Sequence, residues 1–242
     1  MLIHSKTDKG IVRSNNQDAF IAGDIAPNFS FAVVCDGMGG ANAGNIASEI
    51  AVKTVSEYLY NSYRENMTTN DIEKVIKNAV SSANLLIHDR SLKGDDYKGM
   101  GTTIVTAVVK DHIAVIAHVG DSRIYLVNNE FTQLTRDHSM VQTLIETGKI
   151  SPDDAKKHPR KNVITRALGV EAEVVTDFNT QILNSGDTLL LCTDGLTNFV
   201  RDDEIFETFS KNNISQVPQK LVDLANENGG GDNITVVTLT AQ

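Results

Sequence analysis

Five aspartates in this 242-residue chain lie where an extended or apolar segment begins or ends. They are Asp18, Asp36, Asp121, Asp194 and Asp232. Four of the five have a glycine beside them, and glycine lets the chain turn sharply and present a backbone carbonyl oxygen. Carboxylate and carbonyl oxygens are hard ligands that suit Mg²⁺ or Mn²⁺. If the five segments meet in space, the pattern predicts a site for divalent metal ions.

The clearest form of the pattern is an apolar run that ends in Asp-Gly, and it occurs twice. FAVVCDGMGG spans residues 31–40 and LLLCTDGLTN spans residues 189–198. A single Asp-Gly after a strand is most often a simple turn. A lone carboxylate at the end of a buried strand is costly, however, and several together repel one another unless a bound cation reverses the balance. A zinc site is not predicted, because the six histidines show no HExxH spacing and the chain has no CxxC pair.

The composition limits the class of protein. A net charge of −9 argues against a nucleic-acid partner, because binding to phosphate backbones needs a positive surface. Hydrophobic residues make up 40% of the chain, enough for a sizeable core, and the length favours one domain over residues 1–242. No long apolar run and no apolar signal core occur, so we expect no membrane span and a cytoplasmic location. Cys35 and Cys192 are interpreted as small buried strand residues in a reducing compartment, rather than as a disulfide or metal ligands.

Hydrophobic periodicity predicts the elements that must position these aspartates. Strands are expected at 17–25, 29–36, 102–110, 112–120, 122–129, 173–182, 187–194 and 233–241. Helices are expected at 43–62, 71–90, around 202–210 and at 215–228, with a polar, weakly helical segment at 137–158. Asn70, with Glu73 three residues later, is typical of a capping box for the second helix.

The order of these elements indicates the fold class. The connections within 102–129 are too short for crossover helices, so the three strands there are expected to form antiparallel hairpins. Strands and helices are grouped rather than strictly alternating, which favours an α+β fold with antiparallel sheets covered by helices. The long apolar strands further suggest that sheet packs on sheet.

Eight segments resemble, in order, motifs of the bacterial metal-dependent serine/threonine protein phosphatases of the type-2C, or PPM, family. They are VRSNNQDAF, VCDGMGGANAGNIAS, GMGTTIV, AHVGDSRIYL, LTRDHSMV, HPRKNVITRALG, GDTLLLCTDGL and GGGDNITVV. The resemblance spans about residues 4 to 240 and implies a stand-alone, single-domain member. It implies a four-layer α-β-β-α sandwich, in which two antiparallel sheets pack face to face between helix pairs. Residues 139–165 match the family's mobile flap, which we expect to influence the access of protein substrates.

The resemblance also implies a metal centre with two core Mn²⁺ or Mg²⁺ ions and a third, weaker ion. Asp36 would bridge the two core ions, and Asp194 and Asp232 would complete the first core site. The Gly37 carbonyl and, largely through water, Asp18 would serve the second core site. Asp121 and Asp194 match the ligands of the third ion.

The chemistry that the resemblance implies is direct hydrolysis of phosphoserine and phosphothreonine in proteins. A metal-bridging hydroxide would attack phosphorus in line, with no phosphoenzyme intermediate. Arg13 matches the family's phosphate-binding arginine, and its planar fork suits a tetrahedral oxyanion.

Several positions depart from the family's pattern. Some members carry a histidine, a proposed general acid, where this chain has Met38, and many have a histidine where it has Ala41. Methionine cannot donate a proton, so water or another group must protonate the leaving alkoxide. Gln17 stands where eukaryotic relatives place a metal-binding glutamate, which leaves the role of Asp18 the least fixed.

Two other functions stay open on the sequence alone. A general phosphomonoesterase acting on small molecules would carry the same metal centre. A non-catalytic phosphoprotein-binding module would be expected to have lost metal-binding aspartates, and all five are present. As partners, the resemblance implies phosphorylated proteins and a eukaryotic-type serine/threonine kinase as the counterpart, with the phosphatase itself a monomer.

Overall fold

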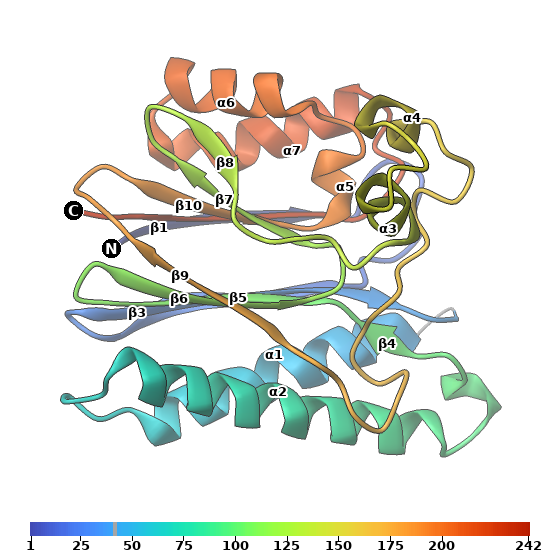
Figure 1. Cartoon of the computed structure of the whole chain (residues 1–242), viewed down its shortest axis with the longest axis horizontal. Coiled ribbons are helices and arrows are strands. Elements are labelled where there is room, and N and C mark those ends of the chain that lie inside the picture. Colours follow the sequence, from blue (N-terminus) through green and yellow to red (C-terminus); the bar gives the residue numbers. More distant parts are fainter. Residues whose placement is uncertain (41–42) are drawn as a thin grey trace.

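Two antiparallel sheets form the centre of the molecule in the computed structural model, which describes residues 1–40 and 43–242 (Figure 1). Ala41, and with it the expectation about that position, lies outside the described residues. The first sheet has the strand order β1 (Leu2–Asp8), β11 (Ile234–Thr240), β10 (Thr188–Cys192), β7 (Arg123–Val127), β8 (Phe131–Gln133). The second has the order β2 (Asp18–Ala26), β3 (Phe29–Met38), β5 (Ile104–Lys110), β6 (Ile113–Val119), β9 (Asp177–Ile182), and the short β4 (Gly101–Thr102) pairs with the end of β3.

Helices cover both outer faces of the stacked sheets. The second sheet is covered by α1 (Ala43–Ser62) and α2 (Thr69–Ser91), and the first by α5 (Asp194–Thr197), α6 (Asp202–Lys211) and α7 (Val217–Glu227) (Figure 1). Two short helices, α3 (Met140–Glu146) and α4 (Pro152–Lys156), lie at one end of the sandwich. The expected α+β sandwich with a helix pair on each side is confirmed.

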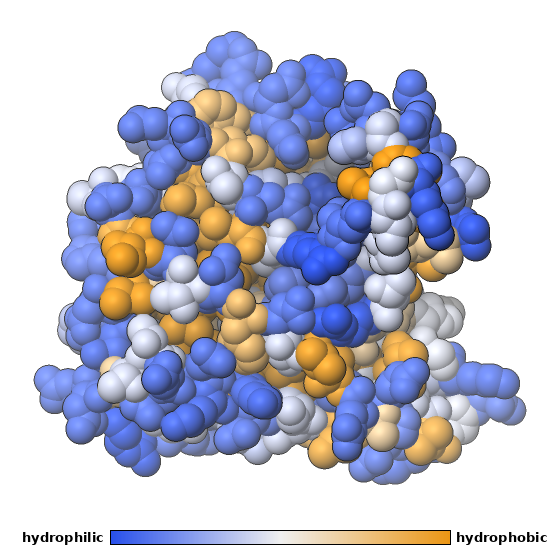
Figure 2. Space-filling model, viewed as in Figure 1, coloured by the Kyte–Doolittle hydropathy of each residue, from blue (hydrophilic) through white to orange (hydrophobic). Residues whose placement is uncertain are grey.

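Burial explains why the central strands read as continuous apolar runs. In β3, Phe31 and Val33 belong to the core beneath α1 and α2, whereas Ala32 and Val34 pack against the other sheet. A strand buried on both faces has no solvent side on which polar residues could alternate. The outer helical layers are largely hydrophilic, and apolar residues are visible mainly between them (Figure 2). No helix in the described ranges is long and apolar enough to cross a membrane.

The strands of residues 102–129 correct one of our expectations. β5 and β6 form the predicted antiparallel hairpin, but β6 and β7 do not pair. β7 pairs with β10 and β8 in the other sheet, so the chain crosses between sheets at Gly120–Ser122. Gly120 has a φ of 110°, a backbone conformation that side-chain-bearing residues rarely adopt. The short connection between β6 and β7 therefore keeps the two strands close in space but does not pair them in one sheet. The crossing places Asp121 between the two sheets.

The start of α2 corrects a second expectation. Thr68, not Asn70, is the N-cap: its hydroxyl accepts the Asp71 N–H at 3.2 Å, and the Asp71 carboxylate accepts the Thr68 N–H at 3.0 Å.

Thr68→Ala is expected to lower the free energy of unfolding by about 1 kcal/mol, measured by urea denaturation. Asn70→Ala is the matched control, because Asn70 lies inside the helix, and it should change stability by less than about 0.5 kcal/mol. Equal losses in the two variants would contradict this assignment of the cap.

Candidate metal centre

The first two aspartates are brought together by strand register. Asp18 begins β2 and lies directly opposite Asp36 in the antiparallel pairing of β2 with β3. One oxygen of Asp18, Oδ2, accepts hydrogen bonds from the hydroxyls of Thr193 at 2.9 Å and Thr235 at 2.7 Å. Both threonines belong to the first sheet: Thr193 directly follows β10, and Thr235 lies in β11. The Asp18 carboxylate therefore joins the two sheets at the end where the aspartates gather.

The other three aspartates reach the same place from separate connections. Asp194 opens α5 directly after β10, Asp232 precedes β11, and Asp121 lies in the crossing between the sheets. Burial raises the pKa of Asp36 well above its ordinary value, and the charges of Asp18, Asp194, Asp121 and Asp232 raise it further. Because the charges of all four other aspartates act on Asp36, the five predicted residues form a single cluster.

The electrostatics of this aspartate cluster suit divalent cations. Burial, reduced by the two threonine hydroxyls and increased by neighbouring carboxylates, raises the pKa of Asp18 to about 7. Burial and the charge of Asp194 raise the pKa of Asp121 to about 8. Among the described residues, Asp18 Oδ1 and Asp194 Oδ1 are buried oxygens without a hydrogen-bond partner. Buried carboxylate oxygens without donors are what a hard cation would satisfy, so the residues present fit such ions.

Backbone contacts hold Asp36 in place, and sequence reasoning did not single out the residues that make them. The Asp36 N–H donates to the Thr103 hydroxyl at 3.0 Å, and the Asp36 carbonyl accepts from the Thr103 N–H and the Thr102 hydroxyl, both at 2.9 Å. The Thr103 hydroxyl also contacts the Ser122 hydroxyl at 2.7 Å, next to Asp121. Buried threonines within apolar strands were the available signal, because a buried hydroxyl needs a partner.

Gly37 continues the chain from Asp36 under tight packing. A Cβ on Gly37 would come within 2.1 Å of the Gly44 carbonyl oxygen and 2.5 Å of the Gln17 carbonyl oxygen. The Gly37 N–H donates to that Gln17 carbonyl at 3.1 Å. Only glycine permits so close an approach of these backbones, so the residue after Asp36 is fixed by geometry.

Arg13 lies at the rim of the aspartate cluster. Its Nη2 lies 2.9 Å from Asp232 Oδ2, and its side chain is 51% exposed. The loop that carries it is tied down by Asn233, whose amide group donates to the Lys9 and Asn15 carbonyls and whose Oδ1 accepts the Gln17 N–H. A half-exposed guanidinium beside the carboxylates can bind an anion that enters from solvent.

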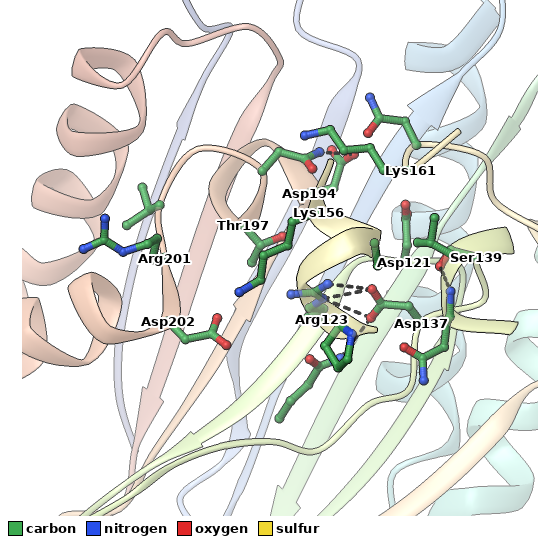
Figure 3. A pocket seen from close by; sticks show the side chains of 18 of the residues that line it. Asp121, Arg123, Asp137, Ser139, Lys156, Lys161, Asp194, Thr197, Arg201 and Asp202 are labelled. Carbon is green, nitrogen blue, oxygen red and sulfur yellow. Dashed lines mark hydrogen bonds and ion pairs between the residues drawn. The ribbon is translucent and has the colours of Figure 1, made fainter. Parts of the chain in front are cut away.

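A cleft of about 500 Å³ opens beside Asp121 and Asp194 (Figure 3). One wall is formed by residues of the 139–162 stretch and the other by residues 197–203 at the junction of α5 and α6. Lys156 and Lys161 lie on the first wall, whereas Arg201 and Asp202 lie on the second. The cleft is a groove between chain segments, and it leads to the carboxylates.

Comparisons with known proteins agree with this geometry. The family model described as protein phosphatase 2C matches residues 10–224. The chain is 42% identical over 237 residues to the serine/threonine phosphatase stp of Listeria monocytogenes, covering 96% of this chain and 92% of that protein. It is similar to the S. agalactiae serine/threonine phosphatase structure, with a TM-score of 0.93, 35% identity and 100% and 99% of the two chains covered. It is also similar to the catalytic domain of the phosphatase PstP in complex with two manganese ions, with a TM-score of 0.85, 31% identity and coverage of 100% and 98%.

Proposed function

Because the chain belongs to the protein phosphatase 2C family and is a metal-dependent serine/threonine protein phosphatase, we propose that the aspartate cluster holds its metal ions. The observation that carries this proposal is the placement of the five aspartates at one end of the sheets, with Asp18 opposite Asp36 and the charges of the other four acting on Asp36. Within the described residues, two of the buried carboxylate oxygens there, Asp18 Oδ1 and Asp194 Oδ1, lack a hydrogen-bond partner. The comparisons confirm the family resemblance seen in the sequence, and they do not favour the rival functions of the sequence analysis.

The proposed division of ligands follows the positions of the residues. Asp36, which interacts with all the others, would lie between two core ions, with Asp194 and Asp232 on one side. Asp18 and the Gly37 carbonyl would serve the second ion, whereas Asp121 and Asp194 would hold a third. When bound, such ions supply an activated water for direct displacement at phosphorus and stabilise charge on the phosphoryl oxygens.

The protein's own side chains would bind and orient the phosphate ester. Arg13 would leave Asp232 in part and donate to two phosphoryl oxygens, since a guanidinium matches a tetrahedral oxyanion. Thr193 and Thr235 would keep one Asp18 oxygen engaged and so direct the other toward the ions. Met38 cannot protonate the leaving alkoxide, so we assign that proton to solvent in the open cleft.

Arg13 gives a direct test of phosphate binding. Arg13→Ala is expected to raise KM for a phosphothreonine peptide about 10- to 100-fold, because a charge-assisted contact worth about 1.5–3 kcal/mol is lost. Arg13→Lys should fall between the wild type and Arg13→Ala, since it keeps the charge but not the fork. Arg64→Ala, an exposed arginine in the loop after α1, is the control. An unchanged KM in Arg13→Ala would remove Arg13 from the proposed binding site.

The open cleft between residues 139–165 and the start of α6 suits a phosphorylated protein segment better than a small metabolite. We propose that residues 139–165 act as a flap that adjusts this cleft, and that the whole chain, 1–242, works as one domain.

The test of the substrate class compares hydrolysis of a phosphothreonine peptide with that of sugar phosphates and nucleotides, each with Mn²⁺ and with EDTA. Metal-dependent preference for the peptide is expected. Equal rates on small phosphates would favour a general phosphomonoesterase, and peptide binding without hydrolysis would favour a binding module.

The cellular setting is part of the same proposal. A protein phosphatase of this kind requires a kinase that makes its substrates, and we propose a serine/threonine kinase as that counterpart. Cys35 and Cys192 are both buried and unpaired, which agrees with a reducing compartment, and we place the enzyme in the cytoplasm as a monomer. Light scattering with size-exclusion chromatography tests the monomer. Phosphoprotein levels in cells that co-express the kinase test the pairing.

A further inference from the structure

Two large apolar residues are exposed in the turn that leads to Arg13. Ile11 is 67% exposed and Val12 is 70% exposed, in the connection between β1 and β2. Surface turns are usually built from glycine, proline, asparagine, aspartate and serine, which suit both the backbone and the solvent. Neither residue belongs to the apolar clusters that form the core of the described residues. The packing of the core therefore does not explain why these two positions are apolar.

The turn has a fixed backbone. The N–H groups of Ile11 and Val12 both donate to the Gly230 carbonyl, at 2.8 and 3.2 Å. Gly10, which opens the turn, has a φ of 76°, and a Cβ there would come within 2.2 Å of the Asp232 carbonyl oxygen. The turn is thus packed closely on residues 230–232, which lead to β11, and it presents its apolar side chains in a defined place.

Ile11 and Arg13 lie next to one another along this segment. Ile11 Cγ1 lies 2.9 Å from the position that a Cβ of Gly230 would take. Arg13 Nη2 lies 2.9 Å from Asp232 Oδ2, two residues further along. Two residues separate the contacts on both segments, so the Ile11 side chain lies beside the guanidinium at the rim of the aspartate cluster.

Phe199 extends the apolar surface to the cleft. A Cβ on Gly231 would come within 2.6 Å of Phe199 Cζ, so the ring lies against the residue that follows Gly230. Phe199 is half-buried, and it is one of the residues that line the cleft beside Asp194. With glycine at 230 and 231, only backbone lies between the ring and the Ile11 side chain. We call Ile11, Val12 and Phe199 the apolar rim.

We propose that the apolar rim binds an apolar side chain of the phosphoprotein substrate, within two positions of the phosphorylated residue. The inference rests on the proposed function, and in particular on the binding of the phosphate by Arg13. Successive residues of an extended segment are about 3.3 Å apart. When the phosphate is held at Arg13, the neighbouring substrate residues must therefore pass over the adjacent surface, which is the apolar rim.

The charges around the apolar rim do not favour a charged neighbour in its place. Arg13 would be engaged by the phosphate. The cleft beyond Phe199 is lined by charged residues of both signs, namely Arg123, Lys156, Lys161 and Arg201 with Asp121, Asp137, Asp194, Asp202 and Asp203. Such a mixed lining gives no net attraction for one sign of charge. Removal of exposed apolar surface from water is favourable for both partners, so an apolar side chain is the occupant that this surface suits.

The test combines Ile11→Ser with Val12→Ser in the full chain, because serine suits an exposed turn. Phe199 is kept, since it also packs against the core. Two phosphothreonine peptides are compared with Mn²⁺, identical except for leucine or serine at the two positions on each side of the phosphothreonine. Ile182→Ser is the matched control, because Ile182 is also 67% exposed and pairs with Ile113, at the end of β6 away from Asp121. The readout is the ratio of kcat/KM for the leucine peptide to kcat/KM for the serine peptide.

The wild type and Ile182→Ser are expected to prefer the leucine peptide about five- to tenfold, as for partial burial of a leucine side chain. In the double variant the ratio should fall below about twofold. Val12→Ser alone should give an intermediate ratio, and it decides the matter if Ile11→Ser prevents folding.

A wild type without this preference, or a double variant that keeps it, would show that the apolar rim does not contact the flanking residue. An equal fall of the ratio in Ile182→Ser would have the same meaning. Light scattering on the same proteins tests the other occupant: a dimeric wild type with a monomeric double variant would assign the apolar rim to contact between copies of the chain and overturn the proposal. Failure of the wild type to hydrolyse either peptide with Mn²⁺ would instead overturn the proposed function on which the inference rests.

Discussion

Asp36→Asn is expected to lose metal-dependent phosphatase activity by a factor on the order of 10³ while remaining folded. The charges of all four other aspartates act on Asp36, so its carboxylate lies where ions held by this cluster would share it. Asparagine keeps the shape but removes that charge and one oxygen ligand. The loss should not be restored by raising Mn²⁺, because the geometry of the centre, and not only its affinity, depends on this residue.

The measurement is hydrolysis of a phosphothreonine peptide across a Mn²⁺ titration, with Asp89→Asn on the exposed face of α2 as the control. A second readout guards against a trivial loss of folding. In EDTA the Asp36→Asn protein should be more stable than the wild type, since one of several repelling buried carboxylates has been removed. Wild-type turnover by the variant at saturating Mn²⁺ would contradict the central place of Asp36.

Local pattern was enough to predict most elements. The helix predicted at 43–62 is observed as Ala43–Ser62, and the helix predicted at 71–90 is observed as Thr69–Ser91, because their buried faces recur with helical spacing. β1 and β8 were not predicted. β8 is three residues long, and β1 is only partly buried along its length, so neither carries a strong apolar signal. The sheet to which β7 belongs was beyond local pattern, because it is decided by pairing with β10, far away in the sequence.

The site divides in a similar way. The five aspartates that the fold gathers could be singled out from the sequence, because each lies at a strand or turn boundary where sequence signals are strong. Their roles as metal ligands stay a prediction. The threonines that hold them could not, since Thr193 and Thr235 act on Asp18 across the sheets, more than 170 positions away. The contact of Arg13 with Asp232 and that of His138 with Asp177 likewise join distant segments. Such side-chain contacts depend on the packed fold, which no local window contains.

The metal-free protein is expected to become less stable as the pH rises from about 6.5 to 8. The folded-state pKa of Asp18 is about 7 and that of Asp121 about 8, both above the ordinary value of 3.8. The folded protein therefore holds more protons than the unfolded chain in this range, and its free energy of unfolding must fall as they are released. One such proton corresponds to about 1.4 kcal/mol for each pH unit, so a loss of about 2 kcal/mol is expected.

The pH range above about 7 separates the effect of the carboxylates on stability from that of the histidines. Burial lowers the pKa of both His118 and His138, so these residues make stability rise with pH until the unfolded histidines have also lost their protons. Above about pH 7 that opposing effect fades, and the carboxylates decide the slope. Urea unfolding in EDTA at several pH values measures it, and Asp121→Asn should flatten the curve. With saturating Mn²⁺ the slope should vanish or reverse, because metal ions and protons compete for the same oxygens. A metal-free stability that stays level or rises between pH 7 and 8 would mean that the five carboxylates do not share one buried site.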